Sequence, residues 1–188
     1  MGFDAQAYGD VFAELISERR LNPLDGGTQN TAVKSKLDTL NVNAAFAEKN
    51  VVDRDMAEGC ISAVWLYHNF LDTSHTISQG ILTETGSYWH GIMHRREPDF
   101  SNSKYWFHKV GYHAIFDTLC QEAAQIASSA DGAPEALASQ SSWDSAGFVD
   151  LCADALEGRS AHDTSCREIQ QREWELLFDY SYKQALGG

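Results

Sequence analysis

The helical spacing of apolar residues is the feature that most constrains the fold of this chain. Apolar side chains recur at intervals of three and four residues over 4–20, and the same spacing returns from Asp53 onward without an alternating, strand-like run. The spacing predicts an all-α protein. The chain has 188 residues, of which 43% are apolar, so it is long enough to bury a core. We expect a single domain, residues 1–188, folded as a helical bundle of about six to eight helices.

Caps and turn-forming residues place the boundaries of the expected helices. A long helix is expected to begin at Asp53 and to run unbroken to Gln79, because no proline or glycine occurs between Cys60 and Gln79. Ser87 is expected to cap the next helix, and Pro98 to end it near Arg96. The other expected helices are 4–20, 32–40, one from about Ser101 to Gly111, and one through Leu119 to Ile126.

The C-terminal third begins with a stretch of unusual composition. Residues 127–142 are rich in Ala, Ser and Gly and poor in large apolar side chains, which predicts a mobile loop or linker that could close over a site. Two further helices are expected after it, 143–156 and 164–186. We expect this pair, within 143–188, to pack on the same core as the rest of the chain.

Net charge excludes several classes of partner. The formal charge is −13 and the isoelectric point is near 4.8, which opposes binding to nucleic acid or to an anionic membrane. No stretch approaches the roughly 18 apolar residues of a membrane span, and no secretion signal is evident at the N-terminus. The four cysteines are widely spaced and form no C-x-x-C pair. These features predict a cytoplasmic protein whose partner is a small-molecule ligand.

A set of histidines predicts a metal site. His90 and His94 lie four residues apart and therefore share a helix face, while His75 lies near the end of the preceding expected helix. A short connection favours antiparallel neighbours, so His75, His90 and His94 are expected to meet, with Asp72 within reach. Imidazoles and a carboxylate in this arrangement fit a divalent transition metal, namely Zn²⁺, Fe²⁺ or Mn²⁺.

Charged neighbours of the histidines suggest catalytic and substrate-binding roles. Glu97 lies one turn beyond His94, so the three histidines and Glu97 are the expected proton-transfer groups. Arg95 and Arg96 offer a fork-shaped guanidinium to an anionic substrate, although either arginine could instead pair internally with Glu97 or Asp99. Three further residues complete the expected substrate-binding set: Tyr88, Trp89 and Lys104.

Three functional readings follow from the sequence. The leading one is a small soluble enzyme that uses a metal at the histidine-rich pocket, with hydrolase, lyase, isomerase and oxygenase chemistry all open. The second is a metal-free enzyme in which a histidine and Asp72 or Glu97 act as an acid–base couple. The third is a helical ligand-binding or interaction protein in which the cluster is structural, and whose aromatic segment 172–182 could form a homo-oligomer.

Two segments also resemble a known group of proteins. "LYHNFLDTSHTISQ" and "SYWHGIMHRREPDFSNSKYWFHKVG" are similar to segments of a family of uncharacterised, mainly bacterial proteins, over about Trp65 to Phe116. The resemblance implies no catalytic assignment. It implies only that the two segments belong to one functional unit.

Overall fold

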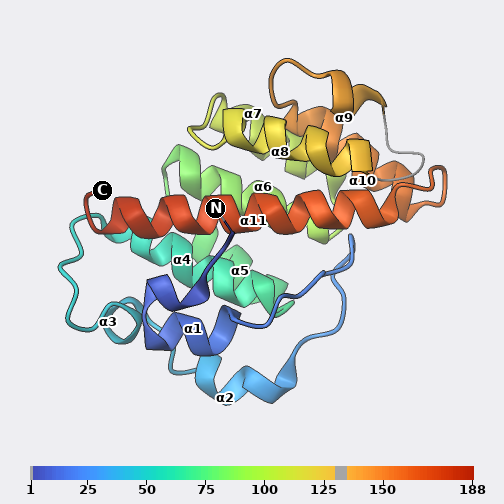
Figure 1. Cartoon of the computed structure of the whole chain (residues 1–188). Helices are drawn as coiled ribbons and strands as arrows, with labels where there is room; N and C mark the ends of the chain where they lie inside the picture. Colours follow the sequence, from blue (N-terminus) through green and yellow to red (C-terminus); the bar gives the residue numbers. More distant parts are fainter. Residues whose placement is uncertain (1, 130–134) are drawn as a thin grey trace.

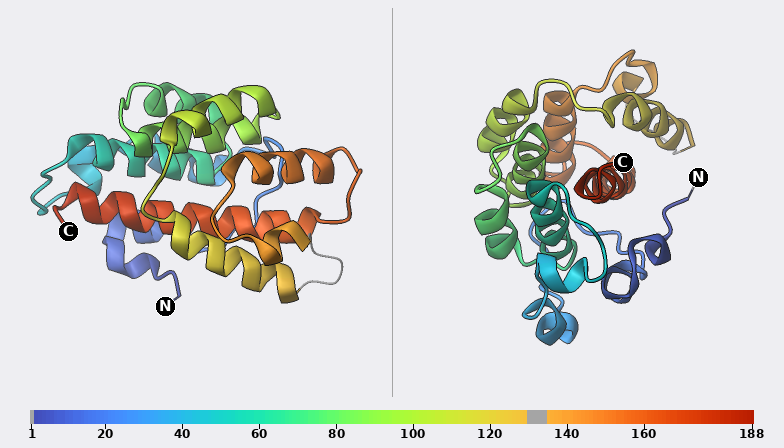
Figure 2. Two further views of the ribbon diagram at one scale, coloured as in Figure 1. Left: turned by 90° about the horizontal axis from the view of Figure 1, so that it is seen from above. Right: turned by 90° about the vertical axis from the view of Figure 1, so that its left-hand side faces the viewer.

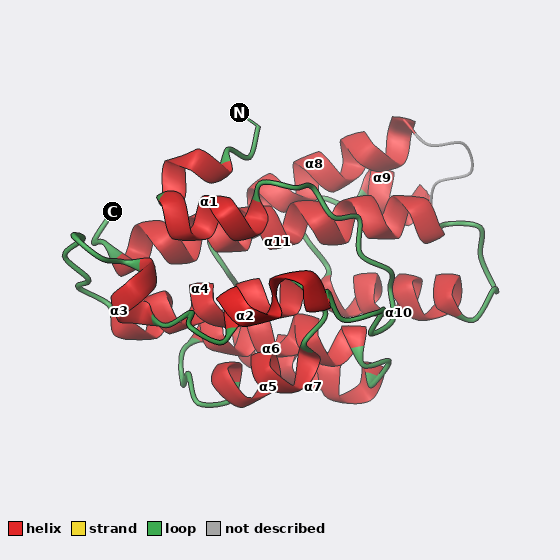
Figure 3. Ribbon diagram, turned by 90° about the horizontal axis from the view of Figure 1, so that it is seen from below, coloured by secondary structure: helices red, strands yellow, loops and turns green. Residues whose placement is uncertain are grey.

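The computed structural model describes residues 2–129 and 135–188, which form helices and no strands (Figures 1 and 3). This confirms the all-α prediction, but the described part has eleven α-helices rather than six to eight, because the expected helix 53–79 is divided and two short helices, at 42–45 and 135–139, were not expected. The helices are α1 (Asp10–Ile16), α2 (Lys34–Leu37), α3 (Val42–Ala45), α4 (Arg54–Tyr67), α5 (Leu71–Ser78), α6 (Glu84–Arg96), α7 (Phe100–Val110), α8 (Phe116–Ser129), α9 (Glu135–Ser139), α10 (Ser145–Leu156) and α11 (Asp163–Ala185).

The longest helix, α11, lies at the centre of the molecule. It packs against α4, α8 and α10, and the end-on view in Figure 2 shows other helices around it. Its inward side is apolar and aromatic: Trp174 stacks on Phe178 with ring centroids 5.0 Å apart, and the Trp174 indole donates to the Ala63 carbonyl oxygen at 3.0 Å. Aromatic burial of this kind contributes strongly to the core. The expected helix pair at the C-terminus is therefore packed on the common core.

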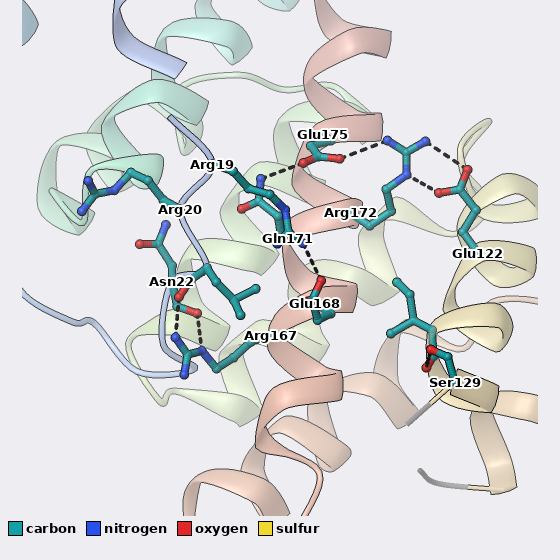
Figure 4. Close-up of polar contacts among 12 residues, drawn as sticks. Arg19, Arg20, Asn22, Glu122, Ser129, Arg167, Glu168, Gln171, Arg172 and Glu175 are labelled. Atoms are coloured by element: carbon teal, nitrogen blue, oxygen red, sulfur yellow. Dashed lines mark hydrogen bonds and ion pairs between the residues drawn. The ribbon is translucent and has the colours of Figure 1, made fainter. Parts of the chain in front are cut away.

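The outward side of α11 holds polar contacts to distant parts of the chain. Figure 4 shows Arg172 reaching Glu122 of α8 and Glu175 of its own helix. Arg167 donates to the carbonyl oxygens of Leu21 and Asn22 in the segment after α1. These contacts tie the N-terminal segment and α8 to the central helix.

The expected helix 53–79 is divided at Asn69, so the prediction of one long helix is wrong. Asn69 has a φ of +64°, in the left-handed region, and separates α4 from α5. Asparagine adopts this conformation more readily than most residues and is a known helix terminator at this position. Its side chain is used as well, because the amide donates to the Thr28 carbonyl oxygen at 2.8 Å and its oxygen accepts from Arg96 at 2.7 Å.

Other expected boundaries shift by a turn or less, with two exceptions. The expected helix 4–20 is divided at Gly9, whose φ is +90°, into a 3₁₀ turn and α1. Helix α6 begins at Glu84 because Thr83, not Ser87, accepts from the Gly86 N–H, and it ends at Arg96, before Pro98, as predicted.

The stretch 127–142 contains more helix than expected. Helix α8 continues to Ser129, and α9 occupies 135–139, while residues 130–134 lie outside the described residues. The prediction of a loop therefore fails for 127–129 and 135–139. Among the described residues, no helix is both long and apolar enough to cross a lipid bilayer. All four cysteines are free and buried.

Candidate metal site between three helices

Helix α6 packs against α5 and α7 (Figure 3), and the histidine cluster comes from α5 and α6. The five-residue connection 79–83 turns the chain back from α5 into α6, which brings the end of α5 beside the start of α6. Asp99 caps α7 through the Asn102 N–H, and α7 then packs along α6. The packing of these three short helices therefore fixes the positions of the side chains between them.

His75, His90 and His94 come together as their register predicts. One ring nitrogen from each lies within 4.8 Å of the others. The Nε2 atoms of His90 and His94 are only 3.0 Å apart, and the His75 ring centroid is 4.6 Å from that of His90 and 5.2 Å from that of His94. His90 and His94 are 2% and 5% exposed, whereas His75 is half-buried.

The polar neighbours of His90 and His94 are compatible with lone pairs on both Nε2 atoms. Ser78 Oγ lies 2.8 Å from His90 Nδ1 and 3.3 Å from the His75 carbonyl oxygen. A carbonyl oxygen can only accept, so both contacts are satisfied when Ser78 donates to it and accepts from the His90 Nδ1–H. On His94, Nδ1 lies 3.2 Å from the Glu97 carboxylate, which also only accepts. In this arrangement both Nε2 lone pairs face the cluster; in the alternative arrangement, Ser78 donates to His90 Nδ1 and the His90 Nε2–H donates to His94 Nε2.

Burial favours the neutral form of these imidazoles. Desolvation lowers the pKa of His90 to about 3, and the neighbouring His94, His75 and Lys109 add to the shift. Desolvation also lowers the pKa of His94, against the opposing effect of Glu97. A neutral imidazole is the form that binds metal, because the ligand nitrogen must be free of its proton.

A metal ion fits between the two facing nitrogens. With metal–nitrogen bonds of about 2.05 Å, an Nε2–Nε2 separation of 3.0 Å gives a ligand–metal–ligand angle of about 94°, and a tetrahedral angle needs a separation of about 3.3 Å. His75 has no side-chain hydrogen bond among the described residues and can turn toward the same point. The described cluster therefore offers three nitrogen ligands.

Two of the predicted acidic site residues have different positions. Asp72 is exposed on α5 and is not part of the group of three, so the structure does not bring it to the predicted metal position. Glu97 lies at the end of α6 and contacts His94 Nδ1, as a carboxylate that orients a metal-binding histidine does. The geometry therefore gives Glu97 a positioning role beside the predicted proton-transfer role.

The two arginines are used inside the fold. Arg95 is 0% exposed, pairs with the fully buried Glu173 of α11, and lies over the Phe148 ring at 4.7 Å. Arg96 is 2% exposed and donates to the Asp25 carbonyl oxygen and to Asn69. Neither pairs with Glu97 or Asp99, and neither side chain is free to hold a substrate, which corrects the predicted role of both.

The other predicted substrate-binding residues also have internal partners. Tyr88 is 0% exposed and donates to Glu173 at 3.0 Å, and Trp89 is 0% exposed and donates to Ser181 at 3.2 Å. Lys104 pairs with Asp150 of α10 at 2.7 Å. Each of these contacts joins α6 or α7 to α10 or α11. They are structural contacts, which leave none of these three side chains without a partner in the described structure.

Sequence reasoning overlooked the side chains that α7 contributes. Asn102 Nδ2 lies 3.1 Å from His94 Nε2, the Trp106 ring centroid is 4.3 Å from that of His90, and Lys109 Nζ lies 4.2 Å above the Trp106 ring. These residues are spaced at i, i+4 and i+7, the signature of one helix face, which was the available signal. The sequence around Ser78 does not indicate that its side chain contacts a histidine.

Comparison of the chain with models of protein families, with curated proteins and with solved structures finds no match in any of the three. The resemblance of segments 65–116 to a bacterial family stays a prediction.

Proposed function

We propose that His75, His90 and His94 bind a zinc ion and that the protein is a small metal-dependent hydrolytic enzyme. Three imidazoles around zinc leave a coordination position open for water or substrate, which is the usual arrangement of catalytic rather than structural zinc. Such an ion polarises a carbonyl group and lowers the pKa of its bound water to about 7.

The close approach of the Nε2 atoms of His90 and His94 is the observation that carries this proposal. When both nitrogens carry lone pairs at a separation of 3.0 Å, they repel each other unless a cation lies between them. The amide of Asn102 can donate to His94 Nε2, but His90 Nε2 has no other polar partner within the described chain. A bound cation satisfies both nitrogens at once.

The donor set favours zinc over the other predicted ions. Imidazole suits Zn²⁺ and Fe²⁺, whereas Mn²⁺ prefers carboxylate oxygens. The iron site of many oxygenases needs two histidines and one carboxylate. Here Asp72 is exposed away from the cluster and Glu97 contacts a histidine nitrogen instead. Three imidazoles without a carboxylate ligand are a better match to zinc.

A metal-free acid–base enzyme has less support. A general base works best when its pKa lies near the working pH. The pKa of His90 is about 3, so at neutral pH this imidazole has little affinity for a proton. The same shift presents no obstacle to binding a metal.

Metal content and activity test the proposal together. Tag-free protein is reconstituted with ZnCl₂, dialysed and analysed by plasma mass spectrometry beside a His90→Asn/His94→Asn variant. His113→Asn is the matched control, because His113 is also buried but lies outside the cluster. We expect about one zinc per chain in the parent and control and none in the double variant.

Hydrolysis of 4-nitrophenyl acetate gives the catalytic readout. We expect chelation to abolish the rate and zinc to restore it in the parent and in His113→Asn. A parent protein that takes up no zinc refutes the metal site. Stoichiometric zinc without any zinc-dependent hydrolysis refutes the enzymatic part alone.

A further inference from the structure

Among the described residues, Lys109 is one of three cations that have no acidic partner. Every Lys and Arg except Lys49, Arg96 and Lys109 has a carboxylate oxygen within 4.0 Å in the described structure. Arg96 is buried and bonded to neutral oxygens. Lys49 and Lys109 are therefore the exposed cations available to an external anion, and only Lys109 lies near the histidines.

Trp106 holds the Lys109 ammonium group beside the cluster. The indole ring packs against His90, with centroids 4.3 Å apart, and Lys109 Nζ lies 4.2 Å from the same indole. Tyr105 contributes a second ring 5.4 Å from Nζ. A cation over aromatic faces is attracted to them but keeps its donors free for an anion. Because both of these distances are measured to the Trp106 ring, Lys109 Nζ is no more than about 8.5 Å from the centre of the His90 ring.

On the basis of the proposed metal centre, we infer that Lys109 binds the anionic group of the substrate. The substrate class is a small molecule with a carboxylate or phosphate group close to the oxygen that the metal polarises.

Local charge favours the same class of substrate. Three neutral imidazoles leave the two positive charges of the ion uncompensated, and Glu97 next to His94 offsets only one of them. Lys109 adds a positive charge on the α7 side. Asn102, on the same face of α7, offers an uncharged amide donor next to His94. An anion is therefore attracted to this point although the chain as a whole carries a charge of −13.

Anion binding to cobalt-substituted protein tests the subsite. Cobalt replaces zinc as a coloured probe, and its visible spectrum is titrated with inorganic phosphate, with acetate and with neutral imidazole. The test variant is Lys109→Gln. The matched control is Lys104→Gln, which removes the same charge from the same helix but is paired with Asp150. Cobalt content is measured in each protein before titration.

We expect equal cobalt content in all three proteins. In Lys109→Gln, the dissociation constants for phosphate and acetate should rise about threefold to tenfold, while imidazole binds as before. Lys104→Gln should stay within twofold of the parent. Full cobalt with equal anion affinities in all three proteins, or with no spectral response to either anion, overturns the subsite alone. Failure of the parent to bind cobalt or zinc overturns the metal centre and the subsite together.

Discussion

Replacing Glu173 by glutamine tests whether Arg95 is a structural charge, as its burial indicates. Glu173 and Arg95 are both 0% exposed and form an ion pair, and Glu173 also accepts from the Tyr88 hydroxyl at 3.0 Å. The Nε and Nη1 atoms of Arg95 have no partner among the described residues. The Glu173 carboxylate is therefore the only described countercharge of this buried guanidinium.

The expected loss of stability follows from the lack of any other described countercharge for Arg95. Glutamine still offers an oxygen to Tyr88, so Glu173→Gln removes little besides the negative charge. Leaving one member of a buried ion pair uncompensated costs about 3–5 kcal/mol. The control is Glu168→Gln, because the Arg19–Glu168 pair is exposed, with side chains 57% and 33% accessible. Exposed pairs of this kind contribute about 0–1 kcal/mol.

Urea denaturation followed by tryptophan fluorescence measures the difference. With an m-value of about 2–3 kcal/mol/M, Glu173→Gln should lower the midpoint by about 1–2 M and Glu168→Gln by less than about 0.5 M. The double variant Arg95→Met/Glu173→Gln removes both charges of this pair and should recover much of the loss. Equal midpoints for the two single variants would refute the reasoning, since the charge of Arg95 would then have another countercharge, such as a bound anion.

Three further predictions concern other parts of the molecule. Burial lowers the pKa of His113 to about 4, below the ordinary value of 6.5, so the unfolded state takes up the proton first as the pH falls. Protonation of His113 in the unfolded state should therefore lower the free energy of unfolding by about 2 kcal/mol between pH 7.5 and pH 5. In urea denaturation, His113→Asn should reduce the pH dependence of this free energy by that amount. An unchanged pH dependence contradicts the prediction. Glu97→Gln weakens the acceptor next to His94 Nδ1 and should lower the affinity for zinc about 10-fold to 100-fold. A competition titration with a chelating dye measures this affinity. An unchanged affinity would show that Glu97 does not orient His94. At the break between α4 and α5, Asn69→Ala should lower the free energy of unfolding by about 1–3 kcal/mol more than Asn69→Gly. Both variants lose the amide contacts, but only alanine is strained at a φ of +64°. Equal losses of stability in urea denaturation would exclude backbone strain.

Local signals in the sequence were sufficient for much of the fold. The end of α6 before Pro98 and the cap of α4 at Asp53 follow from short-range rules of capping and proline geometry, and the limits of α10 and α11 lie within two residues of those predicted. The division of the helix 53–79 at Asn69 did not follow from them. Asparagine is compatible with a helix interior, and what stabilises its left-handed conformation is contact with Thr28 and Arg96, which lie 41 and 27 residues away.

The sequence by itself determined which histidines could meet. A four-residue spacing places His90 and His94 on one face of any helix, and a short connection returns them to the end of the helix that bears His75. Tertiary structure decided the rest, because the partner of a polar side chain depends on which distant element packs against it. Arg95 forms an ion pair with Glu173, which lies 78 residues away in the sequence. The face of α7 that bears Trp106 and Lys109 lies beside the histidines only because α7 packs on α6.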